Sequence, residues 1–145
     1  MVKMDPVVHF EVGYNDRERM KKFYSTCFGW QMNQMGDDMG NYVVAQTGPT
    51  DPKTTRPTEP GFINGGFYAK TDSPDSHAPS FVIAVEHINA SVEAVKKAGG
   101  KIKGGMQPDG SHTMEPTEIP GVGLWISFED TEGNRVSLLQ PNPRA

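Results

Sequence analysis

The chain repeats one pattern, and this repeat constrains its fold more than any single motif does. Residues 7–30, VVHFEVGYNDRERMKKFYSTCFGW, and residues 80–102, SFVIAVEHINASVEAVKKAGGKI, both read as strand, helix cap, amphipathic helix, glycine and strand. Further short strand-like runs follow each copy. The repeat predicts two βαβββ modules, 5–70 and 78–142, within one α+β domain spanning 1–145, and it places a small-molecule cleft between the modules.

Composition excludes several classes of function. The formal net charge is −4, and no basic run is longer than two lysines, which argues against a nucleic-acid-binding protein. The sequence shows neither a signal-peptide pattern nor an apolar run of about 18 residues, so we expect a soluble, cytoplasmic protein without membrane contact. Cys27 is the single cysteine, which excludes an intrachain disulfide, and we expect it to be a buried helix residue.

Hydrophobic alternation defines the first strand, which we expect over 7–12. Val8, Phe10 and Val12 share one face, while His9 and Glu11 share the other. The apolar face is therefore suited to packing against a helix, and the opposite face carries an imidazole and a carboxylate.

Cap signals and apolar stripes delimit the two helices. Asn15 is the expected cap of the first helix and Gly29 its end, with an apolar stripe made of Met20, Phe23, Tyr24, Cys27 and Phe28. Asn89 is the expected cap of the second helix, with Ile88 and Val92 packed around it. The other expected strands are 30–34, 41–46, 62–70, 80–86, 101–103, 123–129 and 135–140, and 47–61 and 104–121 are expected to be long loops.

With both halves in view, the chain resembles the vicinal oxygen chelate superfamily, which contains glyoxalases, bleomycin-resistance proteins and extradiol dioxygenases. The segments that carry the resemblance are HFEVGYNDRERMKKFYSTCFGW, VEHINASVEAVKKAGGKI, IPGVGLW and FEDTEGNRVSLLQP, within residues 7–141. It implies that the two modules form an open, barrel-like mixed sheet around a cleft. It also implies a homodimer, because family members of this size commonly pair.

Metal-dependent members of that superfamily place one ligand on the first strand and one on the last strand of each module. Carried over to this chain, these positions fall on His9, on Gly65 or Gly66, on Ser80 and on Ser137. Glycine has no side chain to offer, and neutral hydroxyls are poor ligands for zinc, nickel or iron. We therefore expect no metal and no other cofactor, and a divalent ion (Zn, Ni, Mn or Fe) belongs only to an alternative function.

His9 and Glu11 are the candidate catalytic pair, because a spacing of two residues puts both side chains on one surface of a strand. A hydrogen-bonded structural histidine and a solvated glutamate are the alternatives. The candidate ligand-binding residues are Ser80, Trp125, Arg135, Ser137 and Phe67. The remaining histidines, His77, His87 and His112, are expected at the surface.

Three functions remain open at this point. The first is a metal-independent glyoxalase-like protein that binds a small, partly hydrophobic molecule, as the antibiotic-sequestering relatives do. The second is a lyase or isomerase of the lactoylglutathione lyase type with an altered metal site. The third is a non-enzymatic regulatory or scaffold module.

Overall fold

The two copies of the repeat fold into two units that each have their own apolar core. The structure is a computed structural model that describes residues 3–106 and 111–143. One unit is Val8–Ser80, and the other combines the described residues up to Val7 with those from Phe81 onward. The first expected module, 5–70, starts earlier than this unit, because the segment before the first strand belongs with the second unit. There, the Ala84 backbone N–H donates to the carbonyl oxygen of Pro6 at 2.9 Å.

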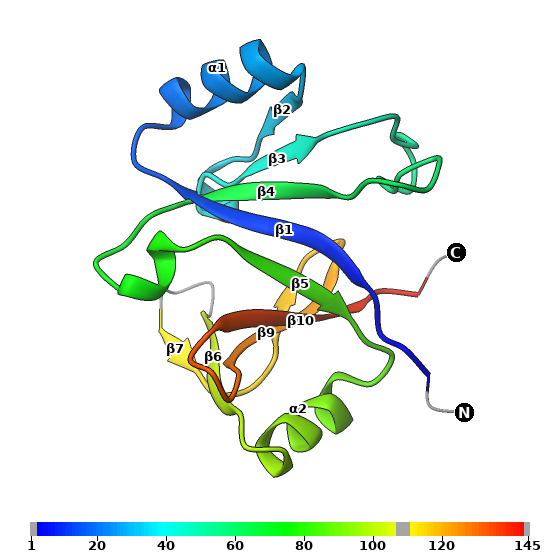
Figure 1. Ribbon diagram of the computed structural model, residues 1–145, viewed down its shortest axis with the longest axis vertical. Helices are drawn as coiled ribbons and strands as arrows, with labels where there is room; N and C mark the ends of the chain where they lie inside the picture. Colours follow the sequence, from blue (N-terminus) through cyan, green and yellow to red (C-terminus); the bar gives the residue numbers. More distant parts are fainter. Residues whose placement is uncertain (1–2, 107–110, 144–145) are drawn as a thin grey trace. The chain divides into compact units, whose positions relative to one another are not determined.

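The first unit contains one α-helix and four strands in the order β2-β3-β4-β1 (Figure 1). β1 and β4 run parallel, and the other neighbours are antiparallel. Its elements are β1 (Val7–Tyr14), α1 (Arg17–Phe28), β2 (Gln31–Gln34), the 3-10 helix η1 (Asp37–Met39), β3 (Val43–Gln46), β4 (Asn64–Ala69) and the 3-10 helix η2 (Pro74–His77).

The second unit repeats this arrangement with the strand order β5-β10-β9-β6-β7, and β8 pairs with β9. β5 and β10 are parallel, as β1 and β4 are. Its elements are β5 (Ser80–Ala84), α2 (Ile88–Lys97), β6 (Lys101–Met106), β7 (His112–Thr113), β8 (Thr117–Ile119), β9 (Gly123–Glu129) and β10 (Arg135–Pro141). The expected α+β class, with mixed sheet and two βαβββ repeats, is confirmed.

The helix α1 begins one residue later than the sequence predicts. Asp16, not Asn15, is the N-cap, and its Oδ1 accepts the Arg19 backbone N–H at 3.0 Å. Both residue types cap helices well, so the sequence alone does not distinguish them. The predicted end is confirmed, because Gly29 adopts the left-handed conformation at φ 72°.

The stripe along α1 is less buried than its spacing predicts. Met20 and Tyr24 pack against the core of the first unit, whose buried members are Tyr14, Val43, Ala45 and Phe67. Phe23 and Phe28 remain 55% and 61% exposed, and Cys27 is also exposed, contrary to expectation. Of the stripe, only Met20 and Tyr24 therefore cover the sheet.

The cap of α2 also differs from the prediction. The N-cap position is His87, which makes no capping hydrogen bond through its side chain. The Ile88 backbone N–H instead donates to Oε1 of Gln140 at 2.9 Å, an acceptor on β10. Ile88 and Val92 are buried as predicted, in a core with Val85, Ile126, Phe128, Val136 and Leu138.

Two features concern the segments outside the main strands. The expected loop 104–121 contains the two short strands β7 and β8, whereas 47–61 has no element beyond an isolated bridge between Thr50 and Pro57.

None of the helices in the described part of the chain combines the length and the apolarity that crossing a membrane requires.

Candidate functional site

The strand β1 presents two chemically different faces, as its alternation predicts. Phe10 and Val12 pack into the core beneath α1. His9 and Glu11 point to the opposite face, which we call the polar face of the first unit. Strand register adds Gly66, the partner of Glu11 on β4, to this face.

Tyr42 joins the two polar side chains of β1 into one hydrogen-bonded chain. Its hydroxyl oxygen lies 2.8 Å from Nε2 of His9, and the hydroxyl donates to Oε2 of Glu11 at 3.4 Å. The rings of His9 and Tyr42 are nearly parallel, with an interplanar angle of 17° and centroids 6.4 Å apart. We call this arrangement the Glu11–Tyr42–His9 chain.

The position of Tyr42 depends on the backbone conformation of its neighbour Asn41 and on the glycine at position 66. Asn41, directly before it, has a left-handed backbone at φ 58°, and the Tyr14 hydroxyl donates to the Asn41 carbonyl oxygen at 2.9 Å. Below the tyrosine ring lies Gly66, where an added Cβ would overlap the Tyr42 hydroxyl. Glycine at 66 is thus what lets the phenol lie against the sheet.

Burial sets the protonation states along this chain. Desolvation lowers the pKa of His9 from 6.5 to about 4, so the imidazole is neutral at pH 7. Burial, followed by the negative charge of Glu11, raises the pKa of Tyr42 well above its usual range, so the phenol stays protonated. The single hydroxyl hydrogen can serve one acceptor at a time. When it is donated to Glu11, Nε2 of His9 must carry the hydrogen of the other bond.

Three predicted site residues share one face of the second unit. On β10, Arg135 and Ser137 alternate with Val136 and Leu138, which are buried in the core that contains Ile88 and Val92 of α2. Register with β9 brings Trp125 to the same face, because it pairs with Leu139, two residues beyond Ser137. These three side chains therefore share one face of the sheet, although Ser137 has no exposed surface.

The two remaining predicted residues have other surroundings. Ser80, the first residue of β5, is buried, and its Oγ, like that of Ser137, has no hydrogen-bond partner in the described part of the chain. Phe67 is completely buried in the core beneath α1, on the face of the sheet opposite to His9 and Glu11. Phe67 does not share a face with His9, because β4 pairs with β1 in a register that matches Phe67 to Val12.

Comparison with known proteins gives the chain a family. Residues 7–138 match the model of the Glyoxalase/Bleomycin resistance protein/Dioxygenase superfamily. The chain belongs to this superfamily. A "Glyoxylase-like domain-containing protein" of Didymella fabae is 31% identical over 136 residues, which cover 92% of each chain.

Two solved structures share the fold of this chain at low sequence identity. A hypothetical protein of Bacillus halodurans superimposes with a TM-score of 0.66 at 13% identity, covering 99% of both chains. Methylmalonyl-CoA epimerase of Mycobacterium tuberculosis gives a TM-score of 0.61 at 14% identity, covering 99% of this chain and 94% of its own. At these identities the likeness establishes the fold alone.

The divalent ion used by metal-dependent members of the superfamily does not fit the residues of this chain. Among the described residues, no three His, Cys, Asp or Glu side chains are grouped closely enough to hold a metal ion. Nε2 of His9 is already bonded to Tyr42, and the phenol lies over Gly66, where an added Cβ would overlap it. Ser80 and Ser137 contribute neutral hydroxyls, which zinc, nickel and iron bind poorly.

The other histidines lie where the sequence predicts. His77, His87 and His112 are all exposed. Nε2 of His77 lies 2.9 Å from the Thr71 carbonyl oxygen, so this side chain belongs to the local turn.

Tyr42 is the residue that sequence reasoning missed. Its position next to His9 depends on pairing between β3 and β4, which joins residues 20 to 24 positions apart. A signal was nevertheless present, because Tyr42 is in phase with Val44 and out of phase with the buried Val43 and Ala45. An aromatic residue with a hydroxyl in the polar phase of a strand is a reasonable partner for a histidine.

Proposed function

We propose that this chain is a metal-independent member of the superfamily that binds a small, partly hydrophobic molecule at the polar face of the first unit. The observation that carries the proposal is the Glu11–Tyr42–His9 chain lying over Gly66. It supplies a neutral imidazole and a protonated phenol, which can exchange hydrogen bonds with a neutral or weakly polar molecule. A small number of placed polar groups in apolar surroundings is the usual form of a small-molecule site.

Metal analysis and a thermal-shift screen test this proposal together. Purified protein should contain no stoichiometric Zn, Ni, Mn or Fe, and adding these ions after chelation should leave Tm unchanged. A panel of small aromatic molecules together with bleomycin should contain compounds that raise Tm, because binding to the native state stabilises it. A stoichiometric metal that is lost in His9→Ala would overturn the metal-independent assignment.

A matched pair of variants localises the binding. We expect His9→Ala to weaken binding of each uncharged compound that raises Tm, whereas His77→Ala, at an exposed turn, should leave it unchanged. If no compound in the panel raises Tm, the third alternative, a regulatory or scaffold module, is favoured. Ser80, Trp125, Arg135 and Ser137 stay predicted ligand contacts, each to be tested by its own alanine variant.

Catalysis by proton transfer is the second candidate function, and the same hydrogen-bonded chain favours it. A hydroxyl shared between a carboxylate and an imidazole can relay a proton to and from a carbon acid next to a carbonyl. Two substrates test this candidate: the glutathione hemithioacetal of methylglyoxal, for lyase activity, and methylmalonyl-CoA in deuterated water, for epimerisation. Turnover that is lost in Glu11→Gln and in Tyr42→Phe would establish an enzyme.

A further inference from the structure

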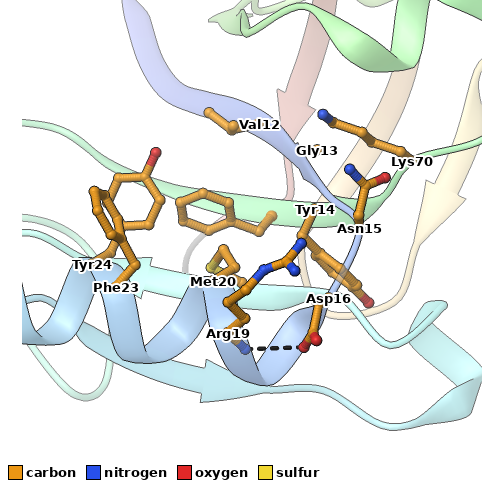
Figure 2. Close-up of a pocket in the computed structure, with 11 residues that line it drawn as sticks. Val12, Gly13, Tyr14, Asn15, Asp16, Arg19, Met20, Phe23, Tyr24 and Lys70 are labelled. Atoms are coloured by element: carbon orange, nitrogen blue, oxygen red, sulfur yellow. Dashed lines mark hydrogen bonds between the residues drawn. The ribbon is translucent and has the colours of Figure 1, made fainter.

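A hollow in the first unit lies at the α1 side of the sheet, away from the polar face. It is a pocket of about 320 Å³ between the start of α1 and the ends of β1 and β4, shown in Figure 2. This volume is at the lower end of the roughly 300–1,000 Å³ that small-molecule sites occupy. We call it the helix-side pocket.

The helix-side pocket has an apolar half and a cationic half. Met20, Phe23 and Tyr24 line one side, and Arg19 and Lys70 lie on the other (Figure 2). Phe23 is 55% exposed, so an aromatic surface remains uncovered at the pocket.

The two cations of the pocket are available for an anion. In the described part of the chain neither the Arg19 guanidinium nor the Lys70 ammonium forms an ion pair, whereas Lys21 and Lys96 are paired with glutamates. Asp16 is the one carboxylate among the lining residues, and it is engaged as the helix cap through the Arg19 backbone N–H. The charges around the pocket therefore sum to one excess positive charge, to which the N-terminus of α1 adds a favourable dipole.

Local packing fixes the position of Lys70. Its backbone N–H donates to the Tyr14 carbonyl oxygen at 2.9 Å. Its aliphatic stem passes over Gly13, where an added Cβ would come within 2.6 Å of Lys70 Cγ. The glycine thus leaves room for the lysine stem beside the pocket.

We propose that the helix-side pocket binds a small monocarboxylic acid with an apolar, aromatic or branched body. The carboxylate would lie between Arg19 and Lys70, since a guanidinium pairs with a carboxylate through two parallel hydrogen bonds. The apolar body would cover Met20, Phe23 and Tyr24. A single excess positive charge suits a monoanion, because it would leave one charge of a phosphate dianion uncompensated.

Phenylacetate and its neutral isostere phenylacetamide test the proposal on the full chain. In an amide NMR titration, phenylacetate should shift signals from residues 13–24 and 67–70. Phenylacetamide should bind at least about fivefold more weakly, because it lacks the charge that the two cations recognise. Equal binding of the two compounds, or no binding of phenylacetate, would overturn the proposal, as would shifts centred on His9 and Tyr42.

Variants separate this site from the proposed function at the polar face. Arg19→Gln and Lys70→Gln should each weaken phenylacetate binding about fivefold or more, and Lys53→Gln, on the 47–61 loop, should not. His9→Ala should leave phenylacetate binding unchanged, so the proposal for the helix-side pocket can be contradicted independently of the proposal for the polar face. Lys70→Met keeps the stem over Gly13 and replaces Lys70→Gln if that variant unfolds. Full affinity in both the Arg19 variant and the Lys70 variant would contradict the assignment.

Discussion

Tyr42 links the two polar side chains that alternate along β1, and its own position depends on a glycine. Its hydroxyl lies between His9 Nε2 and Glu11 Oε2, while its ring occupies the space above Gly66. A hydroxyl that connects two largely buried polar groups contributes more to stability than one hydrogen bond does, because removing it leaves both groups without a hydrogen-bond partner.

Tyr42→Phe tests the contribution of that hydroxyl. We expect the free energy of unfolding to fall by about 1–3 kcal/mol, since His9 and Glu11 each lose a hydrogen bond in partly buried surroundings. Urea unfolding followed by circular dichroism measures the change. Tyr24→Phe is the matched control, because none of the hydrogen bonds found in the described residues involves the Tyr24 hydroxyl. Equal losses in the two variants would contradict the role given to Tyr42.

The lowered pKa of His9 predicts a specific pH dependence of stability. The folded protein holds this imidazole at a pKa of about 4, below its ordinary value of 6.5, so the unfolded chain takes up the proton first. The neutral His9 side chain therefore makes its full contribution to the free energy of unfolding above about pH 6.5. This contribution declines as pH falls toward 4, by at most about 3 kcal/mol. Unfolding measured from pH 4 to 7 should show a smaller decline in His9→Gln and an unchanged one in His77→Gln. An NMR titration of His9 with a midpoint near 6.5 would contradict the prediction.

At the scale of elements, the two helices of the repeat are capped by different means. α1 carries its own cap, Asp16, whereas α2 receives an acceptor from Gln140 on β10. The first is a local interaction that strengthens the helix itself. The second couples the start of a helix to a strand 52 positions away, so it forms only when the unit has folded.

Gln140→Leu should therefore lower the free energy of unfolding by about 1–2 kcal/mol, because the Ile88 N–H loses its acceptor. Gln140→Glu keeps an oxygen at that position and should retain most of the stability. Thermal and urea unfolding of both variants provide the comparison. If leucine and glutamate have the same effect at 140, the hydrogen bond to Ile88 does not stabilise the helix.

Elements were predictable where local periodicity determines them. The strands 123–129 and 135–140, and the end of α1 at Gly29, follow from alternation and turn chemistry within a few residues. The starts of the helices were not predictable, because Asn15 and Asp16 cap equally well and Gln140, the acceptor at the start of α2, is remote in sequence. β7 and β8 were also missed, since two- and three-residue strands depend on the partner strand and not on their own pattern.

At the scale of the whole molecule, the candidate site also combines features that local periodicity determines with features that depend on pairing between strands. The shared face of His9 and Glu11, and that of Arg135 and Ser137, follow from a period of two along single strands, whereas Trp125 joins the latter face through the register of β9 with β10. The position of Phe67 and the participation of Tyr42 depend on how β4 pairs with β1 and β3. A shift of one residue in such a pairing exchanges the two faces, so the sequence alone does not determine which face Phe67 occupies.

The resemblance to dimeric family members leads us to expect a homodimer. Light scattering coupled to size-exclusion chromatography should give twice the chain mass of 15.9 kDa. A dimer that stabilises the fold also makes Tm rise with protein concentration, which distinguishes it from weak self-association. A monomer mass with a Tm independent of concentration would contradict the expectation.

The pairing of Tyr42 with Gly66 limits how this protein can change by mutation. A carboxylate introduced at 66 alone would collide with the phenol, and removal of the phenol alone would leave a gap with no new ligand. A stepwise route from this chain to a metal-binding variant therefore passes through a single mutant in which either the phenol is displaced or its space is empty. Laboratory evolution by one-step substitutions should rarely cross it, whereas a library that varies positions 42 and 66 together would reach both states.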